Sequence, residues 1–292
     1  MDAGDGTLYT ATRDGWIKRM HANGSWEDWK FVGGSSLLGL TLSRAGHLLV
    51  ADADKGLLKV GKEGVVILAS QVNGTKIRFA DDVIEASDGS IYFSDASCKF
   101  GLDEWFFDVL EGRPHGRLLK YDATSQETTL VLTDLAFANG VALSADDDFL
   151  VVCETWKFRC LKHWLKGEKK GETEIFVDNL PGGPDNIKLA PDGSFWVAIL
   201  KLRSTGMDLI HRSATVKKVF AVAFPEIASV KFLGAMKKGA MVANVGSDGK
   251  IRRVLDDSQG KMMSFVTSAL EFDDHLYMGS LLSDFIGKLK LK

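Results

Sequence analysis

The sequence predicts an all-β fold, a six-bladed β-propeller with helical insertions over its top face and an incomplete first blade. Three observations support this prediction: a short motif recurs six times, the copies are about 40 residues apart, and most of the chain lacks helical periodicity. Each copy is a turn signal followed by a short aromatic or aliphatic run, and the copies cover residues 4–12, 44–52, 87–95, 146–154, 191–199 and 272–280. One copy per blade implies six blades in a single domain, residues 1–292.

The spacing of the copies fits a four-stranded blade. Gly6 and Gly46 are 40 residues apart, Gly46 and Gly89 are 43 apart, and Asp148 and Gly193 are 45 apart. A second short strand is predicted before most of the turns, at residues 39–43, 82–86, 140–144, 186–190 and 267–271. Strand-like runs follow the copies at residues 56–60, 116–121 and 250–255. An α/β sheet is disfavoured because none of these segments has a helical period.

Two insertions differ from the strands. Residues 98–115 carry apolar side chains at helical spacing between Leu102 and Leu110, and residues 201–238 do so between Val216 and Ala223, before Pro225. Both insertions follow the second strand of a blade, so we expect them on the face where the innermost strands begin. Two interpretations are open: a substrate-covering lid, or a shield for the tops of the blades.

The composition excludes several classes of function. The chain has 292 residues, 45% of them hydrophobic, and a net charge of -3 without a basic stripe, which argues against nucleic acid as a partner. No apolar run reaches the eighteen residues of a membrane span, and the N-terminus lacks the basic flank and apolar core of a signal peptide. We expect a small-molecule ligand; the sequence sets no oligomeric state.

Cysteine and asparagine give weaker signals. The spacing of Cys98, Cys153 and Cys160 fits no zinc site. We favour free buried thiols, and a Cys153–Cys160 disulfide across a hairpin is the alternative. Asn23 and Asn73 begin glycosylation acceptor triplets, which matter only in a secreted chain.

The starts of three predicted innermost strands carry oxygen-bearing side chains. These are Asp81 in the third blade, Asn139 in the fourth and Asp185 in the fifth. Because innermost strands converge on the propeller axis, the three side chains predict a hard-cation site of the kind that Ca²⁺ accepts. Asp82, beside Asp81, is expected to point back into its own blade and to hold neighbouring backbone.

Several long motifs are familiar. GSIYFSDAS, EGRPHGRLLKYD, FANGVALSADDDFLVVCET and GGPDNIKLAPDGSFWVAIL resemble the strictosidine synthase-like proteins of plants and their animal relative, the adipocyte plasma-membrane-associated protein. More distantly, the chain is similar to the gluconolactonase and paraoxonase group. The resemblance covers essentially the whole chain and implies a six-bladed propeller with its site at the top of the axial channel.

The resemblance also implies a ligand set. Metal-using relatives hold Ca²⁺ through an acid of the first blade and through Asn or Asp residues that match Asp81, Asn139 and Asp185. The strand that would carry the first-blade acid lies before residue 4, so we expect an N-terminally short propeller and weaker cation binding. Relatives travel the secretory route to vacuole, endoplasmic reticulum or cell exterior, whereas this chain shows no entry signal.

A second departure concerns catalysis. True strictosidine synthase uses a glutamate on the innermost strand of the last blade for its Pictet-Spengler condensation, and Thr267 takes that position here. A hydroxyl cannot exchange protons near neutral pH as a carboxylate can. The leading hypothesis is therefore a metal-assisted hydrolase of esters, lactones or phosphotriesters, with His115 as candidate base. The alternatives are the condensation itself and a non-catalytic ligand-binding or scaffold propeller.

Overall fold

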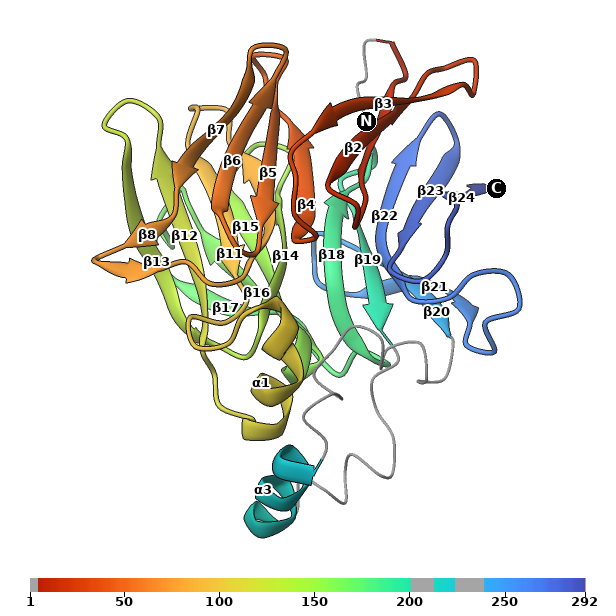
Figure 1. The fold of residues 1–292 in the computed structure, drawn as a ribbon. Helices are drawn as coiled ribbons and strands as arrows, with labels where there is room; N and C mark the ends of the chain where they lie inside the picture. Colours follow the sequence, from red (N-terminus) through yellow and green to blue (C-terminus); the bar gives the residue numbers. More distant parts are fainter. Residues whose placement is uncertain (1–4, 201–212, 224–238, 292) are drawn as a thin grey trace.

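The computed structural model describes residues 5–200, 213–223 and 239–291, and it confirms a six-bladed β-propeller (Figure 1). Six antiparallel sheets follow one another along the chain. The second to fifth have four strands each: β4 (Leu37–Leu42), β5 (Leu48–Asp52), β6 (Gly56–Gly61) and β7 (Gly64–Ala69); β10 (Ala80–Glu85), β11 (Ile91–Asp95), β12 (Gly116–Asp122) and β13 (Glu127–Leu135); β14 (Ala138–Leu143), β15 (Phe149–Glu154), β16 (Arg159–Trp164) and β17 (Thr173–Val177); β18 (Gly183–Leu189), β19 (Phe195–Leu200), β20 (Ala240–Val245) and β21 (Ile251–Asp257).

The first and sixth sheets have three strands each in the described part of the chain. They are β1 (Leu8–Ala11), β2 (Trp16–Met20) and β3 (Trp26–Phe31), and β22 (Val266–Phe272), β23 (His275–Ser280) and β24 (Gly287–Lys290). A small hairpin of β8 (Gln71–Val72) and β9 (Thr75–Lys76) follows the second sheet. β1 carries the first copy of the repeated motif, which elsewhere forms the second strand of a blade. Among the described residues, the first sheet therefore has no counterpart of the innermost strand that the other blades carry.

The predicted inner strands are confirmed as β4, β10, β14, β18 and β22, and the run at residues 250–255 lies in β21. The sequence prediction did not include β20, most of the outermost strands, or the β8–β9 hairpin. The hydrophobic core lies between adjacent sheets: Phe149 and Phe176 of the fourth sheet pack with Phe195 of the fifth.

The innermost strands press against one another around the axis. A Cβ atom at Gly39 of β4 would lie 2.6 Å from the carbonyl oxygen of Asp81 in the next sheet. One at Gly140 of β14 would lie 2.5 Å from the carbonyl oxygen of Asp185. Real Cβ contacts are not this short, so both positions accept only glycine without a shift of the neighbouring strand.

Acidic residues at the ends of three second strands fix the segments that lead into the innermost strands. Asp95 Oδ1 accepts a hydrogen bond from the Phe79 backbone N–H at 2.9 Å, and Glu154 Oε1 accepts one from that of Ala136 at 2.9 Å. Asp52 Oδ1 accepts the Ser36 hydroxyl at 2.8 Å. Each acid is also paired with a cation, namely Lys55, Arg117 or Arg159. The buried carboxylates are thereby satisfied, and the entries to three inner strands have defined positions.

The first insertion is helical, as predicted. A 3₁₀ turn, η1 (Leu102–Glu104), leads into α1 (Trp105–Glu111), which ends at Gly112 with φ 67°. Trp105, Phe106 and Leu110 are buried in an aromatic cluster with residues of several other blades. A second 3₁₀ turn, η2 (Thr155–Lys157), is tied to α1 because the Trp156 indole N–H donates to Asp108 at 2.9 Å. The cluster therefore covers the end of the propeller at which the innermost strands begin.

The second insertion contains α3 (Ala214–Ala223), which confirms the helix predicted between Val216 and Ala223 and contacts α1. The rest of the predicted insertion, residues 201–212 and 224–238, lies outside the described residues. The lid interpretation of both insertions stays a prediction.

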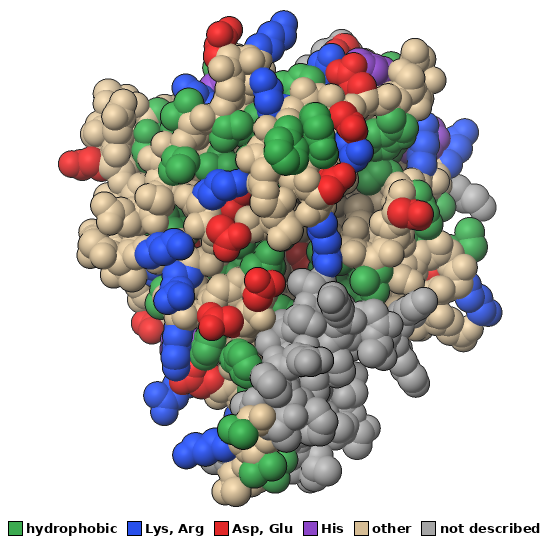
Figure 2. Space-filling view, viewed as in Figure 1, with side chains coloured by type: hydrophobic (Ala, Val, Ile, Leu, Met, Phe, Trp, Pro, Cys, Tyr) green, Lys and Arg blue, Asp and Glu red, His purple; other side chains and the backbone are tan. Residues whose placement is uncertain are grey.

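The surface carries mixed charge. On the face drawn in Figure 2, Lys and Arg side chains are interspersed with Asp and Glu side chains. Within the described part of the chain, no helix has the length and apolar character needed to cross a membrane.

The close approach at Gly140 leads to a stability prediction. We expect Gly140→Ala to lower the free energy of unfolding by about 1–3 kcal/mol, because overpacking forces β14 away from β18. Urea denaturation measures the loss. Gly61→Ala in β6 is the matched control, since its nearest neighbour would be His47 Cβ at 3.7 Å, an ordinary contact. Equal stability of the two variants would contradict the close-approach argument.

Candidate functional site

A β-bulge at the start of each innermost strand positions the site. In β10, Ala80 pairs with Asp95 and Val83 pairs with Phe93, so one extra residue stands on the inner strand. The same irregularity occurs in β4, β14, β18 and β22. The bulged positions are Leu38–Gly39, Asp81–Asp82, Asn139–Gly140, Asp185–Asn186 and Thr267. Bulges commonly re-aim side chains beside active sites, and here they turn polar groups toward the axis.

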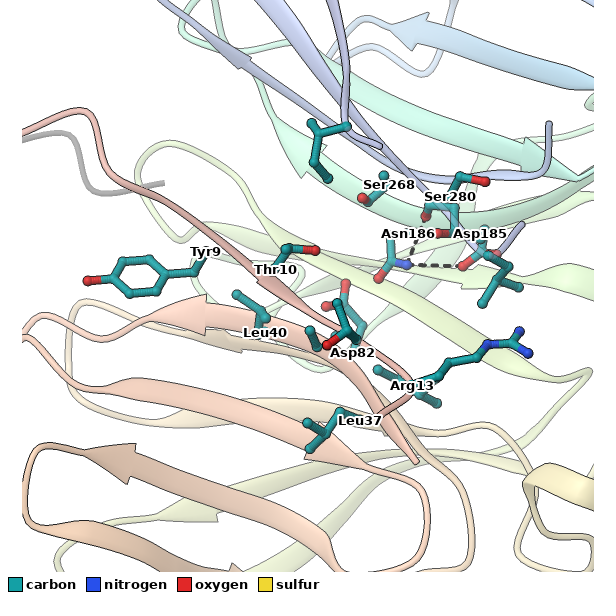
Figure 3. Close-up of a pocket in the computed structure, with 18 of the residues that line it drawn as sticks. Tyr9, Thr10, Arg13, Leu37, Leu40, Asp82, Asp185, Asn186, Ser268 and Ser280 are labelled. Carbon is teal, nitrogen blue, oxygen red and sulfur yellow. Dashed lines mark hydrogen bonds between the residues drawn. The ribbon is translucent and has the colours of Figure 1, made fainter. Parts of the chain in front are cut away.

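Four oxygen-bearing side chains meet at this level. Asp81, Asn139 and Asp185 are buried and line one cavity together with Asn186 (Figure 3). The structure thus brings together the three residues predicted as ligands and adds a fourth. Asn186 Nδ2 donates to Asp185 Oδ1 at 3.0 Å and to the Thr267 carbonyl oxygen at 2.8 Å. These two bonds fix the orientation of the Asn186 amide.

Burial changes the protonation of the two acids. Desolvation raises the pKa of Asp185 to about 8, and the charge of Asp82 adds to the effect, while hydrogen bonds from Asn186 and Asn139 oppose it. Desolvation also raises the pKa of Asp81 well above its ordinary value. The negative charges of Asp185, Asp82 and Asp95 raise it further. A nearby cation would favour the ionised form of both acids. Without a cation, protonation of these acids relieves the repulsion between the carboxylates.

The donor set fits a hard divalent cation. The Oδ1 atoms of Asn139 and Asn186 are buried and have no hydrogen-bond partner. An unpartnered buried carbonyl oxygen is costly, and a cation is one of the few groups that can satisfy two of them beside two carboxylates. No cluster of three His, Cys, Asp or Glu side chains suited to a metal occurs among the described residues, because half of this set consists of amides.

The cavity above the oxygen cluster is large and amphipathic. It has a volume of about 1840 Å³. On one side its wall is apolar, formed by side chains from several blades that include Phe79, Trp105, Phe137, Trp156 and Leu200. On the other side it is lined by Tyr9 and Thr10 of β1 and by Ser268 and Ser280 of the last sheet (Figure 3). The cavity can therefore hold a polar group at the oxygen cluster and an apolar group against the aromatic wall.

Asp82 holds neighbouring backbone, as expected, but that backbone belongs to the next sheet, so the expectation that Asp82 points back into its own blade was wrong. Its carboxylate is fully buried and accepts the Val141 backbone N–H of the next sheet at 3.1 Å. Both carboxylate oxygens also face the Lys188 ammonium, at 3.0 and 3.1 Å. The bulge explains the error, because an extra residue breaks the alternation on which the expected orientation was based.

The two predicted catalytic positions lie in different surroundings. Thr267 is at the bulge of β22, lines the cavity and contacts Asn186 through its carbonyl oxygen. His115 precedes β12, and its ring lies 3.1 Å from a Glu111 carboxylate oxygen and packs against Phe100. His115 does not line the cavity. Its role as a base stays a prediction that this geometry does not support.

The remaining sequence signals have defined places. Cys153 and Cys160 are free, buried thiols directly opposite each other on β15 and β16. Asn23 and Asn73 are exposed, so both acceptor triplets would be accessible to modification.

Two site residues were missed by the sequence analysis. Asn186 adjoins a predicted ligand and could have been found by asking which bulge residue turns inward. Lys188 gave no signal, since its partner Asp82 is 106 positions away.

Comparisons with known proteins identify relatives of this chain. A family model described as strictosidine synthase matches residues 81–168. Strictosidine synthase-like 4 of Arabidopsis thaliana is 36% identical over 294 residues, covering 97% of this chain and 76% of the relative. The adipocyte plasma membrane-associated protein of Rattus norvegicus is 36% identical over 265 residues, covering 87% and 70%.

Solved structures share the fold at low identity. A gluconolactonase from Xanthomonas campestris has a TM-score of 0.67 and 15% identity, over 95% of this chain and 80% of that one. A calcium-binding protein, regucalcin, from Agrobacterium tumefaciens has a TM-score of 0.58 and 14% identity, over 97% and 82%.

The raised pKa of Asp185 predicts the pH dependence of stability in chelator. Between pH 5 and 8 the folded chain keeps a proton that the unfolded chain has lost, so the free energy of unfolding falls as pH rises. The slope contribution is at most about 1.4 kcal/mol per pH unit for each retained proton. Urea denaturation across this range should show a flatter profile for Asp185→Asn. The exposed Asp178→Asn is the control and should follow the parent; parallel profiles for all three proteins would refute the prediction.

Proposed function

This chain belongs to the strictosidine synthase-like family, and from that membership together with the oxygen cluster in the cavity we propose that it is a divalent-cation-assisted hydrolase of esters, lactones or phosphotriesters. The observation that carries the proposal is the pair of unpartnered amide oxygens, on Asn139 and Asn186, beside two buried acids. A fold gains nothing from such an arrangement unless a ligand completes it.

The names of the structural neighbours support the reaction class. One neighbour is called a gluconolactonase and another a calcium-binding protein, regucalcin. For this chain they favour ester or lactone hydrolysis and calcium as the cation, held by Asp81, Asn139, Asp185 and Asn186. When bound, a divalent cation supplies a Lewis acid that polarises a carbonyl or phosphoryl oxygen.

The chain's own residues provide orientation and exclusion of water. Asn186 is held with its oxygen free because its amide nitrogen is engaged by Asp185 and by Thr267. Asn139 carries the same kind of free oxygen from the neighbouring sheet. The apolar wall binds the non-reacting part of the substrate next to the oxygen cluster, which favours substrates with an aromatic or aliphatic group.

Ester hydrolysis tests the proposal directly. We expect the purified chain to hydrolyse p-nitrophenyl or naphthyl esters in the presence of Ca²⁺ and to lose this activity in chelator. Asp185→Ala should lose more than about a hundredfold in kcat/KM, because a ligand is removed. Asp178→Ala, an exposed acid outside the cavity, is the matched control and should keep the parent activity.

The same assay distinguishes the alternatives. Activity that persists in chelator and in Asp185→Ala would exclude the metal-assisted mechanism. Calcium binding without hydrolysis across the ester panel would favour a ligand-binding propeller.

We further propose that the chain does not catalyse the Pictet-Spengler condensation. Thr267 lies on the innermost strand of the last sheet, and a threonine hydroxyl is a poor proton carrier near neutral pH. Glu271, on the same strand, accepts a hydrogen bond from the Trp196 indole N–H at 2.6 Å and does not line the cavity.

Incubation with tryptamine and secologanin should therefore give no condensation product by mass spectrometry. Product formed at an enzymatic rate, and lost in Thr267→Val, would show that this assignment is wrong.

A further inference from the structure

A buried ion pair lies directly beside the proposed cation site. Asp82 follows the candidate ligand Asp81 in the chain and has no exposed surface. The Lys188 ammonium lies 3.0 and 3.1 Å from its two carboxylate oxygens, and the Lys188 side chain is 20% exposed. This pair joins β10 of the third sheet to β18 of the fifth across the axis. Its position raises the question of what the ammonium does for the site.

The pair forms part of the boundary between two cavities. Asp82 and Lys188 line the main cavity, and Lys188 also lines a smaller one of about 220 Å³, together with charged residues such as Arg44, Glu85 and Asp147. In the axial part of the main cavity, the Lys188 ammonium pairs with Asp82, and the carboxylates of Asp81 and Asp185 line the same cavity. The other acid whose charge reaches Asp81 is Asp95, and Arg117 neutralises it. Two negative charges therefore remain, which one divalent cation matches.

We propose that the Lys188 ammonium is the resident countercharge of Asp82 and limits the axial site to one divalent cation. The inference rests on the cation in the proposed function. Both Asp82 oxygens are engaged by Lys188, and one also accepts the Val141 N–H, so Asp82 is not open to a cation. Removal of the ammonium would leave an ionisable carboxylate beside Asp81 and facing the cavity, which is a ligand that Ca²⁺ accepts.

Calorimetric titration of the full, chelator-stripped chain with CaCl₂ tests the stoichiometry. We expect one Ca²⁺ per parent chain and two per chain in Lys188→Met, whose side chain has a similar length but no charge. Lys188→Arg keeps the cation and should bind one. The double variant Asp82→Asn/Lys188→Met removes both charges and should also bind one.

The opposite substitution tests the same idea without removing the ammonium. In Asp82→Asn, the Lys188 ammonium keeps its charge but loses its partner, so the net negative charge beside the proposed cation site falls by one. We expect calcium affinity to fall by about tenfold or more, because the charge of the ligand set tunes affinity. This variant keeps the inference falsifiable if Lys188→Met does not fold, which its thermal unfolding curve would reveal.

The outcomes separate this inference from the proposed function. If Lys188→Met folds and binds as many Ca²⁺ ions per chain as the parent, the inference is overturned and the proposed function stays intact. If Lys188→Met does not fold, a calcium affinity of Asp82→Asn equal to that of the parent has the same consequence. A parent that binds no Ca²⁺ alongside a Lys188→Met that binds one would overturn the proposed cation and the limit of one, and would support only the role of Lys188 as the countercharge of Asp82. A purely structural ion pair would lower the melting temperature of Lys188→Met without a change in stoichiometry.

Discussion

The inner edges of the blades are packed so tightly that one strand must lack a side chain where the next strand bulges toward it. Gly39 meets the bulge at Asp81–Asp82, and Gly140 meets the bulge at Asp185–Asn186. The extra residue turns polar side chains to the axis, and the glycine of the preceding strand makes room for the backbone that carries them. At these two contacts, the position of the site residues and the packing of the innermost strands therefore depend on the same close approach of backbone to glycine.

The axial acids are costly to bury in their ionised forms. Desolvation raises the pKa of both Asp81 and Asp185, and nearby carboxylate charges, that of Asp82 among them, add to the effect. Elsewhere the fold treats buried acids differently: Asp95 and Glu154 each have a cationic partner and a backbone donor. The contrast sets the axial acids apart from these two, because Asp81 and Asp185 have no ion pair among the residues that the structure describes.

Local patterns in the sequence were enough to predict the blade number, the inner strands and three of the four polar residues that meet at the axis. Turn signals, strand runs and helical spacing are encoded within a dozen residues, which is why they can be read locally. The orientation of Asp82 could not be predicted, since a bulge reverses the facing of a side chain without a distinct sequence signal. Lys188 was missed because an ion pair between sheets depends on how the ring closes. β20 follows the long second insertion, where no period connects it to the preceding copy.

The side chains at the β-bulges of the innermost strands determine which reactions the cavity could support. The third, fourth and fifth blades supply oxygens, the second supplies Leu38 and Gly39, and the last supplies Thr267. The bulges of the second and last blades therefore carry no acid, and the ionisable groups at this level are Asp81, Asp82 and Asp185. Asp82 is neutralised by Lys188, so the other two remain to bind a cation. In the proposed hydrolase, a site built this way would activate a substrate oxygen by charge, and the aromatic wall would select the substrate's apolar part. Proton transfer by a carboxylate in the last blade, which a condensation would need, has no equivalent on β22 facing the cavity.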